Sequence, residues 1–177
     1  MAGYRLVWFQ HLHKAAGTYV IRRAQANGEK FWPNHENGNP VSNGKVIPLW
    51  EMESRELTSF IDECEEQGVT FVACEWGGPD YETLANDERV TMLTCLRDPI
   101  KRLVSNFNYD HYWMWTKATS YQEYIAEGHL HSSPEYYTKI FARGELDSNK
   151  AKANIDLFDY VIAVSYTHLT LPTTSTV

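Results

Sequence analysis

Short apolar runs alternate with amphipathic stretches along most of the chain. Four runs, at residues 4–10, 69–76, 89–97 and 158–164, are dense in Val, Leu, Phe and Trp. Their length and their β-branched and aromatic content favour buried strands over helices. Between these runs, apolar residues recur at helical spacing, which predicts helices at residues 18–26, 53–67, 99–108 and 148–157 and a short one within 77–88.

Start and stop signals support several of these helices. Gly68 stands just after the second predicted helix, in the C′ position where glycine is favoured. Pro99 stands at the first position of a later helix, where proline is tolerated best. Ser120 with Glu123 forms a capping-box pattern and Ser133 precedes a proline, so two further short helices are expected there.

Strands that alternate with helices indicate an α/β fold, with a central parallel sheet flanked by helices on both faces. Ligands of such folds gather at the carboxyl ends of the strands. The chain has 177 residues, enough for one domain with its own core, which we expect at residues 1–164. Residues 27–48 are rich in Asn, Gly and Pro, which predicts a long surface excursion without a helix or a central strand.

The last segment, residues 165–177, breaks this alternation and offers neither a helix nor a face for the core. Its sequence, SYTHLTLPTTSTV, resembles the translated read-through of a cloning or sequencing adaptor. We therefore interpret it as a non-native tail. The natural protein is then expected to continue differently after Val164, so that the fold of this chain is expected to be truncated at its C-terminus.

Composition and charge exclude several classes of protein. The apolar content of 43% argues against disorder, and the formal net charge of -7 disfavours a nucleic-acid binder, whose affinity depends on clustered Lys and Arg. Cys64, Cys74 and Cys95 form neither a metal-binding C-x-x-C pair nor an even set, so we expect core thiols. No run reaches the roughly 18 apolar residues of a membrane span, and no signal peptide is recognisable, so this chain is expected to be soluble.

The segment between the first strand and the first helix has the composition of an anion site. It is HLHKAAGT, residues 11–18. A strand ends there, a tight turn presents backbone N–H groups, and a helix begins with the positive end of its dipole at the same point. Gly17 allows a close approach of backbone to ligand, while Thr18 adds a hydroxyl group and Lys14 a mobile positive charge. The spacing differs from G-x-x-x-x-G-K-[ST], which disfavours an ordinary ATP or GTP P-loop.

A second basic motif follows the third predicted strand. It is LRDPIKRLVSNF, which contains the pattern R-x-P-x-x-R-x-x-S. Arg97 leaves the sheet at its carboxyl end, and Ser105 lies two helical turns farther on, where its hydroxyl can point toward the same ligand. Such a pair suits a second phosphate. We expect Arg102 to be structural and to pair with a carboxylate such as Asp98 or Asp110.

Together, HLHKAAGT and LRDPIKRLVS resemble the two donor-binding signatures of the sulfotransferase superfamily that uses 3′-phosphoadenosine 5′-phosphosulfate (PAPS). The nearest likeness is to the Golgi carbohydrate sulfotransferases of the heparan and chondroitin type, whose loop commonly has the pattern H-x-P/Q-K-T/A-G/A-G-T. The resemblance covers residues 4–164 and extends to AKANIDLFDYVIAV, where a helix feeds a later strand. It implies a P-loop-like three-layer fold, and transfer of a sulfonate from PAPS to a hydroxyl or amine of a carbohydrate-like acceptor.

The resemblance also implies roles for individual residues. Lys14 would neutralise charge on the bridging oxygen as the S–O bond breaks. Arg97 and Ser105 would hold the 3′-phosphate, which distinguishes this donor from ATP. No metal is implied, and the sequence shows no cluster of metal ligands. The donor loop around the 5′-phosphate would comprise His13, Lys14, Ala15, Ala16, Gly17, Thr18 and Tyr19.

A hydroxyl acceptor also requires a general base, which the sequence leaves open. Glu75 ends the second predicted strand, and burial beside Trp76 would raise its pKa toward a useful value. His11 and His13 flank the loop lysine and are rivals for the role. A purely structural role for all three residues is a further alternative.

The aromatic stretch at residues 106–115, NFNYDHYWMW, has two interpretations. Aromatic runs are usually core. Alternatively, the stretch forms one wall of an acceptor cleft, where Tyr and Trp stack on sugar rings or enclose a hydrophobic alcohol.

Two other functions stay open beside the sulfotransferase. One is a non-catalytic or truncated nucleotide-binding or scaffold domain. The other is a P-loop small-molecule kinase, which the spacing of the loop and the presence of Arg97 and Ser105 disfavour. The expected partner is a carbohydrate or small hydroxyl acceptor. The resemblance places the protein in the Golgi lumen, attached to the membrane only through an anchor absent from this chain.

Overall fold

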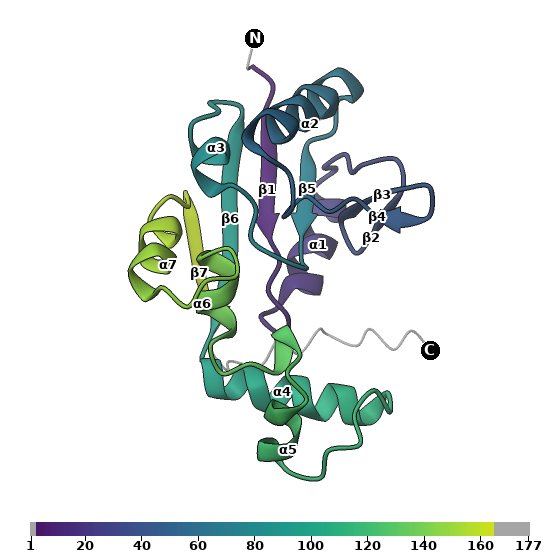
Figure 1. Ribbon diagram of the computed structural model, residues 1–177. Coiled ribbons are helices and arrows are strands. Elements are labelled where there is room, and N and C mark those ends of the chain that lie inside the picture. Colours follow the sequence, from purple (N-terminus) through teal and green to yellow (C-terminus); the bar gives the residue numbers. More distant parts are fainter. Residues whose placement is uncertain (1–2, 165–177) are drawn as a thin grey trace, which may run out of the picture.

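In the computed structural model, which describes residues 3–164, parallel strands form a sheet through the centre of the molecule (Figure 1). Within these residues the sheet has four strands, in the order β5-β1-β6-β7. The predicted α/β class with a central parallel sheet is therefore confirmed. The tail predicted at residues 165–177 lies outside the described residues. The strands are β1 (Leu6–Gln10), β5 (Phe71–Cys74), β6 (Val90–Arg97) and β7 (Tyr160–Val164).

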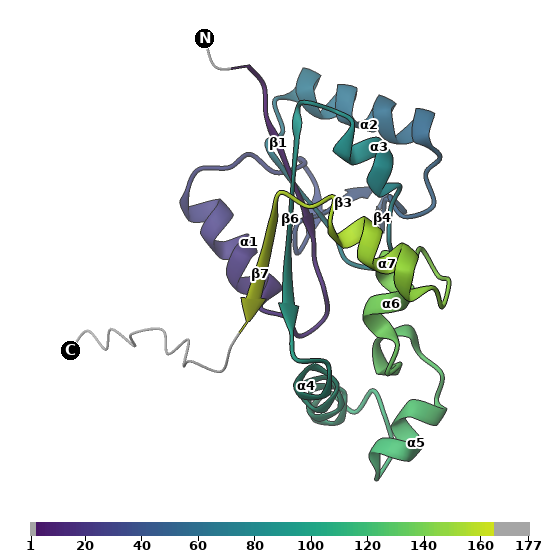
Figure 2. The same cartoon turned by 90° about the vertical axis from the view of Figure 1, so that its left-hand side faces the viewer.

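Helices cover both faces of this sheet, as predicted (Figure 2). One face is covered by α1 (Gly17–Ala26). The opposite face is covered by α2 (Ser54–Gln67) and α3 (Tyr81–Ala85), followed by α6 (Tyr136–Phe141) and α7 (Ser148–Ile155).

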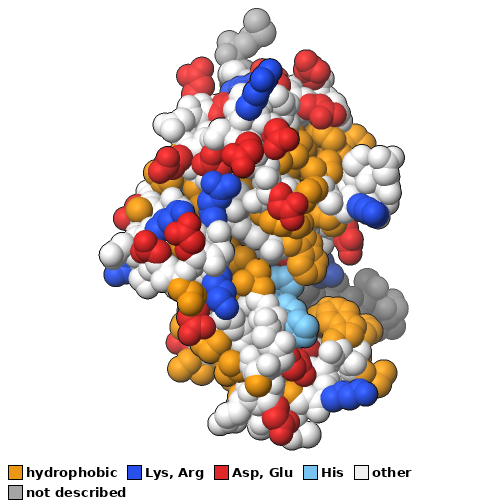
Figure 3. Space-filling model, viewed as in Figure 1, with side chains coloured by type: hydrophobic (Ala, Val, Ile, Leu, Met, Phe, Trp, Pro, Cys, Tyr) orange, Lys and Arg blue, Asp and Glu red, His pale blue; other side chains and the backbone are white. Residues whose placement is uncertain are grey.

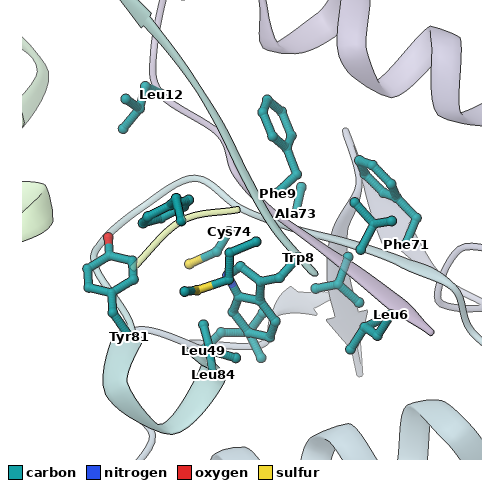
Figure 4. Packing of buried hydrophobic residues seen from close by; sticks show 14 of the residues in the cluster. Leu6, Trp8, Phe9, Leu12, Leu49, Phe71, Ala73, Cys74, Tyr81 and Leu84 are labelled. Atoms are coloured by element: carbon teal, nitrogen blue, oxygen red, sulfur yellow. The ribbon is translucent and has the colours of Figure 1, made fainter. Parts of the chain in front are cut away.

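The core explains why the first strand is apolar up to its last residue, Gln10. Every residue of β1 is buried, because the strand lies between two neighbours and is covered on both faces. Trp8 points toward α2, where its ring meets the ring of Phe60 edge-on at a centroid distance of 6.4 Å. Phe9 points the other way and packs with Phe71 (Figure 4). Cys64, Cys74 and Cys95 are buried free thiols, as predicted.

Two helices lie beyond the carboxyl ends of the strands: α4 (Pro99–Tyr112) and α5 (Tyr121–Ala126) (Figure 1). The α4 helix extends one turn farther than predicted. Ser120 caps α5 by accepting a hydrogen bond from the Glu123 N–H, as predicted. Ser133 does not cap the next helix, because the short 3₁₀ helix η1 (Leu130–Ser132) precedes it and Glu135 occupies the cap position of α6.

Residues 27–48 are more ordered than a surface excursion. They form a small antiparallel sheet of β2 (His35–Glu36), β3 (Asn39–Ser42) and β4 (Lys45–Val46), which docks against the outer edge of β5. The Ala73 N–H donates to the Gly38 carbonyl at 2.9 Å. The physical reason lies in two Asn-Gly pairs, which have positive φ at both residues, as tight hairpin turns require.

Within residues 3–164, no helix is both long and apolar enough to cross a membrane.

Candidate functional site

A cleft of about 600 Å³ opens at the carboxyl ends of β1, β5 and β6, where α4 faces the sheet. Figure 3 shows histidine side chains gathered between the part of the molecule that holds the sheet and the part that holds α4 and α5. A cleft of this size is in the range of small-molecule sites. The residues that line it outside the β1–α1 turn are Asn37, Glu75, Trp76, Arg97, Ser105, Tyr109, Asp110, Trp115 and His131.

The β1–α1 turn forms one wall of the cleft in an unusual backbone conformation. Lys14 and Ala16 have φ values of 61° and 66°, in the left-handed region that L-residues rarely adopt. These two residues reverse the chain, so that α1 begins at the cleft. The Tyr19 N–H already donates to the Ala16 carbonyl at 3.0 Å. The N–H groups of Gly17 and Thr18 precede the first intrahelical acceptor and are the ones that an anion can use. The lining residues of this turn are His11, His13, Lys14, Ala16, Gly17 and Thr18.

Gly17 is required by a close contact with His11. A Cβ atom added at Gly17 would lie 1.8 Å from Cδ2 and 1.9 Å from Nε2 of the His11 ring. The ring is held in this position from its other side, because it stacks on Phe9 with the ring centroids 5.5 Å apart. The turn therefore closes around the imidazole, and only a glycine leaves room for it.

Glu75 lies at the floor of the cleft, immediately after β5. Its carboxylate accepts a hydrogen bond from Nδ2 of the buried Asn39 at 3.2 Å, and its own N–H donates to Oδ1 of the same residue at 3.0 Å. His11 Nδ1 lies 3.5 Å from one carboxylate oxygen and His13 Nε2 lies 3.7 Å from the other. Burial raises the pKa of Glu75 to about 7, and the hydrogen bonds from Asn39 and Asn37 limit the rise.

The two histidines of the turn remain neutral at neutral pH. Burial lowers the pKa of His11 to about 4. Burial, followed by the positive charge of neighbours such as His131, lowers the pKa of His13 to about 3. His13 is enclosed by rings, since it stacks on His131 and meets Trp76 edge-on at 5.2 Å. Glu75 is therefore the stronger base of the three candidates near neutral pH.

Lys14 and Arg97 bring positive charge to the cleft from different elements. The Lys14 ammonium group lies 3.8 Å from the centroid of the Tyr109 ring, and burial lowers its pKa. Arg97 donates from Nη1 to the Lys14 carbonyl at 3.0 Å, which ties the two predicted phosphate motifs together. Tyr137 fixes the backbone of Arg97, because its hydroxyl donates to the Arg97 carbonyl at 2.8 Å and accepts from the Arg97 N–H at 3.2 Å.

Arg102 is structural, as expected, but not through a carboxylate. It is 1% exposed and donates to the carbonyl groups of His131, at 3.0 Å, and Ser133, at 3.4 Å. Its guanidinium group lies 4.2 Å from the centroid of the Tyr136 ring. The expected pairing with Asp98 or Asp110 was therefore wrong, because α4 turns Arg102 toward α6 and η1.

Asp110 and His131 belong to the site, although neither was a candidate from the sequence. Their side chains approach to 3.4 Å, and Asp110 also accepts hydrogen bonds from Tyr124 and Asn106. An acidic residue in an aromatic helix and a histidine in a short 3₁₀ helix give no local signal. Asn37 and Asn39 were missed as well, although the Asn-Gly pair at residues 37–38 marks the hairpin that carries them.

The structure brings nearly all of the predicted site residues together. Lys14, Gly17 and Thr18 line the cleft, and so do the other predicted residues His11, His13, Ala16, Glu75, Arg97 and Ser105. Ala15 is fully buried, and its N–H donates to the Leu12 carbonyl. It therefore stabilises the turn and does not face the cleft. Tyr19 is 42% exposed and lies outside the lining.

The arrangement has a clear chemical capacity. One wall offers helix N–H groups, an ammonium and a guanidinium group to an anionic ligand, while the floor offers a carboxylate that ionises near neutral pH. In residues 3–164, no group of three or more His, Cys, Asp or Glu side chains is arranged to hold a metal ion.

Comparison with known proteins adds no family. No protein-family model matches the chain, and no curated protein does so either.

Gly17→Ala tests the packing of the turn. We expect the added methyl group to push the His11 ring away from Glu75 and to lower the free energy of unfolding by about 1–3 kcal/mol, as overpacking does. Urea denaturation measures this loss. The double variant His11→Ala/Gly17→Ala should lose less than the sum of the single variants, because the clashing ring is gone. Strict additivity would show that the two residues are not coupled.

The titration of Glu75 provides a second test. We expect carbon-detected NMR to give a midpoint near pH 7, and Asn39→Asp to raise the pKa further by replacing a donor with a negative charge. Asn149→Ala, an exposed asparagine on α7, is the control and should leave the midpoint unchanged. A Glu75 midpoint near the ordinary value of 4.5 would contradict the structure.

The same shift has a consequence for stability. The unfolded carboxyl ionises near pH 4.5 and the folded one near 7, so this group's contribution to stability falls as the pH rises through that window. Glu75→Gln should remove the fall. Its free energy of unfolding relative to the wild type should therefore increase between pH 4.5 and 7 and then level off.

Proposed function

We propose that this protein is a PAPS-dependent sulfotransferase, which transfers a sulfonate to a hydroxyl or amine of a carbohydrate-like acceptor. The observation that supports the proposal is the meeting of both predicted phosphate motifs with Glu75 in one cleft. These parts come from three separate elements: the β1–α1 turn, the β6–α4 connection and the end of β5. In this proposal the sheet is of the P-loop-like type, with the β1–α1 turn as its anion loop.

The donor fits the cationic wall of the cleft. The 5′-phosphosulfate lies at the amino end of α1, against the N–H groups of Gly17 and Thr18 and the ammonium group of Lys14. The 3′-phosphate lies against Arg97 and Ser105. The hydrogen bond from Arg97 to the Lys14 carbonyl keeps the two phosphate sites in a fixed relation. Two anion sites on one rigid wall distinguish this donor from a nucleotide without a 3′-phosphate.

Transfer then requires positioning and charge balance. The acceptor O–H gives its proton to the Glu75 carboxylate, and the acceptor oxygen forms the new bond to sulfur. The bond between sulfur and the bridging oxygen breaks, and adenosine 3′,5′-bisphosphate leaves with the charge that Lys14 offsets. Glu75 is preferred over His11 as the base, because the His11 ring is enclosed between Phe9 and Gly17.

The Golgi lumen, with attachment through a segment outside this sequence, belongs to the proposal on the strength of the resemblance alone. Of the other functions considered, an ATP-dependent kinase would leave the Arg97 and Ser105 site without a ligand.

Calorimetric titration tests the donor site. We expect adenosine 3′,5′-bisphosphate to bind much more tightly than ADP. Lys14→Ala and Arg97→Ala should each weaken this binding by about 10- to 100-fold, since a hydrogen bond to a charged group contributes about 1.5–3 kcal/mol. Lys152→Ala, on α7, is the matched control and should bind as the wild type does. Equal affinity for ADP, with each variant folded by circular dichroism, would contradict the proposal.

Transfer of ³⁵S from labelled PAPS to a mixture of desulfated glycans tests the base. The rate should rise with pH to a plateau above about pH 7, as Glu75 ionises. Glu75→Gln should lower kcat by about 10²- to 10⁴-fold, the usual contribution of a general base, while bisphosphate binding stays unchanged. Glu66→Gln, an exposed acid on α2, should keep full activity. Unchanged kcat in Glu75→Gln would assign the base elsewhere.

A further inference from the structure

The end of α4 carries a group of exposed aromatic residues. We call it the aromatic tip. Its members at the helix end are strongly exposed, with Trp113 at 51% and Trp115 at 67%, so the interpretation of this stretch as core was wrong for them. Large exposed rings that gather at one place mark a binding surface more often than chance exposure does. The aromatic tip consists of Tyr109, Tyr112, Trp113, Met114 and Trp115.

The rings of the tip are ordered by packing on one another. Trp113 and Trp115 lie with their planes 27° apart and their centroids 6.4 Å apart. Tyr109 meets the Trp115 ring edge-on, at 5.5 Å and 80°. The two indoles therefore present nearly parallel faces, braced by a tyrosine at right angles to one of them.

The backbone fixes this arrangement at the end of the helix. The Trp115 N–H donates to the Asp110 carbonyl at 2.8 Å, and the Met114 N–H donates to the His111 carbonyl at 3.1 Å. This pair of bonds is the Schellman motif. The first residue after the C-cap of such a motif adopts a left-handed conformation and is usually glycine. Here it is Met114, with a φ of 57°, which costs about 1 kcal/mol or more. The tip is thus a defined turn and not a loose loop.

The tip continues the wall of the cleft. Tyr109 and Trp115 line the cleft, and Trp76, which is half exposed, lines it as well. The Tyr109 ring also holds the Lys14 ammonium group, 3.8 Å from its centroid. The aromatic surface therefore begins where the proposed donor site ends. An acceptor has to bind next to the donor, so this surface is in the position of an acceptor subsite.

The charges of the cleft restrict the chemistry of that acceptor. In the proposed function, Lys14 and Arg97 are occupied by the donor. Among the described lining residues, the other groups that carry or gain charge in the neutral range are the acids Glu75 and Asp110 and three histidines. Burial lowers the pKa of each of these histidines. Lys117, two residues beyond the tip, lies outside the lining. Within this cleft, a polyanionic acceptor would therefore meet carboxylates. The cations Lys139, Arg143 and Lys150 line a separate hollow, which among the described residues shares only Trp76 with the cleft.

The polar floor of the cleft restricts the acceptor further. Glu75 and Asn37 lie in the cleft beside the aromatic wall, together with Asp110 and the histidines. A purely apolar alcohol would cover these polar groups without pairing them, which is costly. A pyranose ring has apolar C–H faces that stack on indole and hydroxyl groups at its edge that pair with such a floor.

We propose that the aromatic tip is the acceptor subsite and that it binds an uncharged sugar ring. This proposal rests on the proposed function, from which it takes the position of the donor. It adds where the acceptor binds and that the acceptor is uncharged. The exposed outer surface of the Trp113 and Trp115 pair stacks on the sugar, Tyr109 joins this subsite to the donor site, and Glu75 receives the proton of the reacting hydroxyl.

A glycan array tests the proposal. The labelled full chain is applied to neutral oligosaccharides, such as N-acetyllactosamine and cellotetraose, and to chondroitin and heparosan oligosaccharides, with adenosine 3′,5′-bisphosphate and without it. We expect binding to neutral glycans to exceed binding to the anionic ones. Trp113→Ala and Trp115→Ala should each weaken it by about tenfold, the scale of a lost stacking contact. Tyr160→Ala, an exposed aromatic residue on β7, is the control.

The outcomes separate this proposal from the one on which it rests. Preference for chondroitin or heparosan would overturn the uncharged acceptor. A sugar acceptor would also be overturned if p-cresol, a small aromatic alcohol, inhibited glycan binding while free N-acetyllactosamine did not. Neutral binding that is equal in the wild type and both tryptophan variants would overturn the subsite. Neutral binding that depends on the tryptophans, in a chain that fails to bind the bisphosphate, would support the subsite and reject the sulfotransferase.

Discussion

The contact between the His11 ring and Gly17 determines the geometry of the whole cleft. It allows the chain to leave β1, turn through two left-handed residues and begin α1 within a few residues. A side chain at residue 17 would occupy the space of the imidazole, so that the start of α1 would have to move away from the sheet. The same ring lies against Phe9 on one side and near Glu75 at its edge. One steric fit thus places the amino end of a helix, a mobile cation and a buried acid around one space.

The electrostatics of the cleft follow from this close packing. Removal of water disfavours every charge in it, so that the histidines stay neutral and the Glu75 pKa is raised to about 7. The same removal of water strengthens the attraction between the remaining cations and an anion, because the local dielectric is low. Lys14 avoids part of the cost through the face of Tyr109, and Arg97 through the Lys14 carbonyl. The cleft is therefore cationic where α1 begins and carries its carboxyl groups, Glu75 and Asp110, on other elements.

Much of this could be predicted from local patterns, and the rest depends on contacts distant in sequence. The four apolar runs gave the strands of the sheet, and the two basic motifs gave most of the cationic wall. The pairing of Asn39 with Glu75 joins residues 36 positions apart, and no local pattern encodes such a contact. The aromatic content at residues 106–115 left both a core and a cleft wall open, because composition does not show where a helix ends. Met114, in a left-handed conformation, ends the helix and turns the chain before Trp115. The Asn-Gly pairs that fold residues 27–48 were visible but were interpreted only as loop signals.

The α4 helix would keep the two proposed subsites, of different chemistry, in register. Arg102, Asn106 and Asp110 are its buried residues, spaced four apart, and they fasten the helix to α5, α6 and η1. Ser105 and Tyr109 are also spaced four apart, on a neighbouring face that lines the cleft. The proposed donor contact and the first ring of the aromatic tip therefore lie one helical turn apart on a rigid element. A site of this kind fixes the distance between donor and acceptor through backbone hydrogen bonds, so that differences in acceptor preference require only new side chains beyond Tyr109.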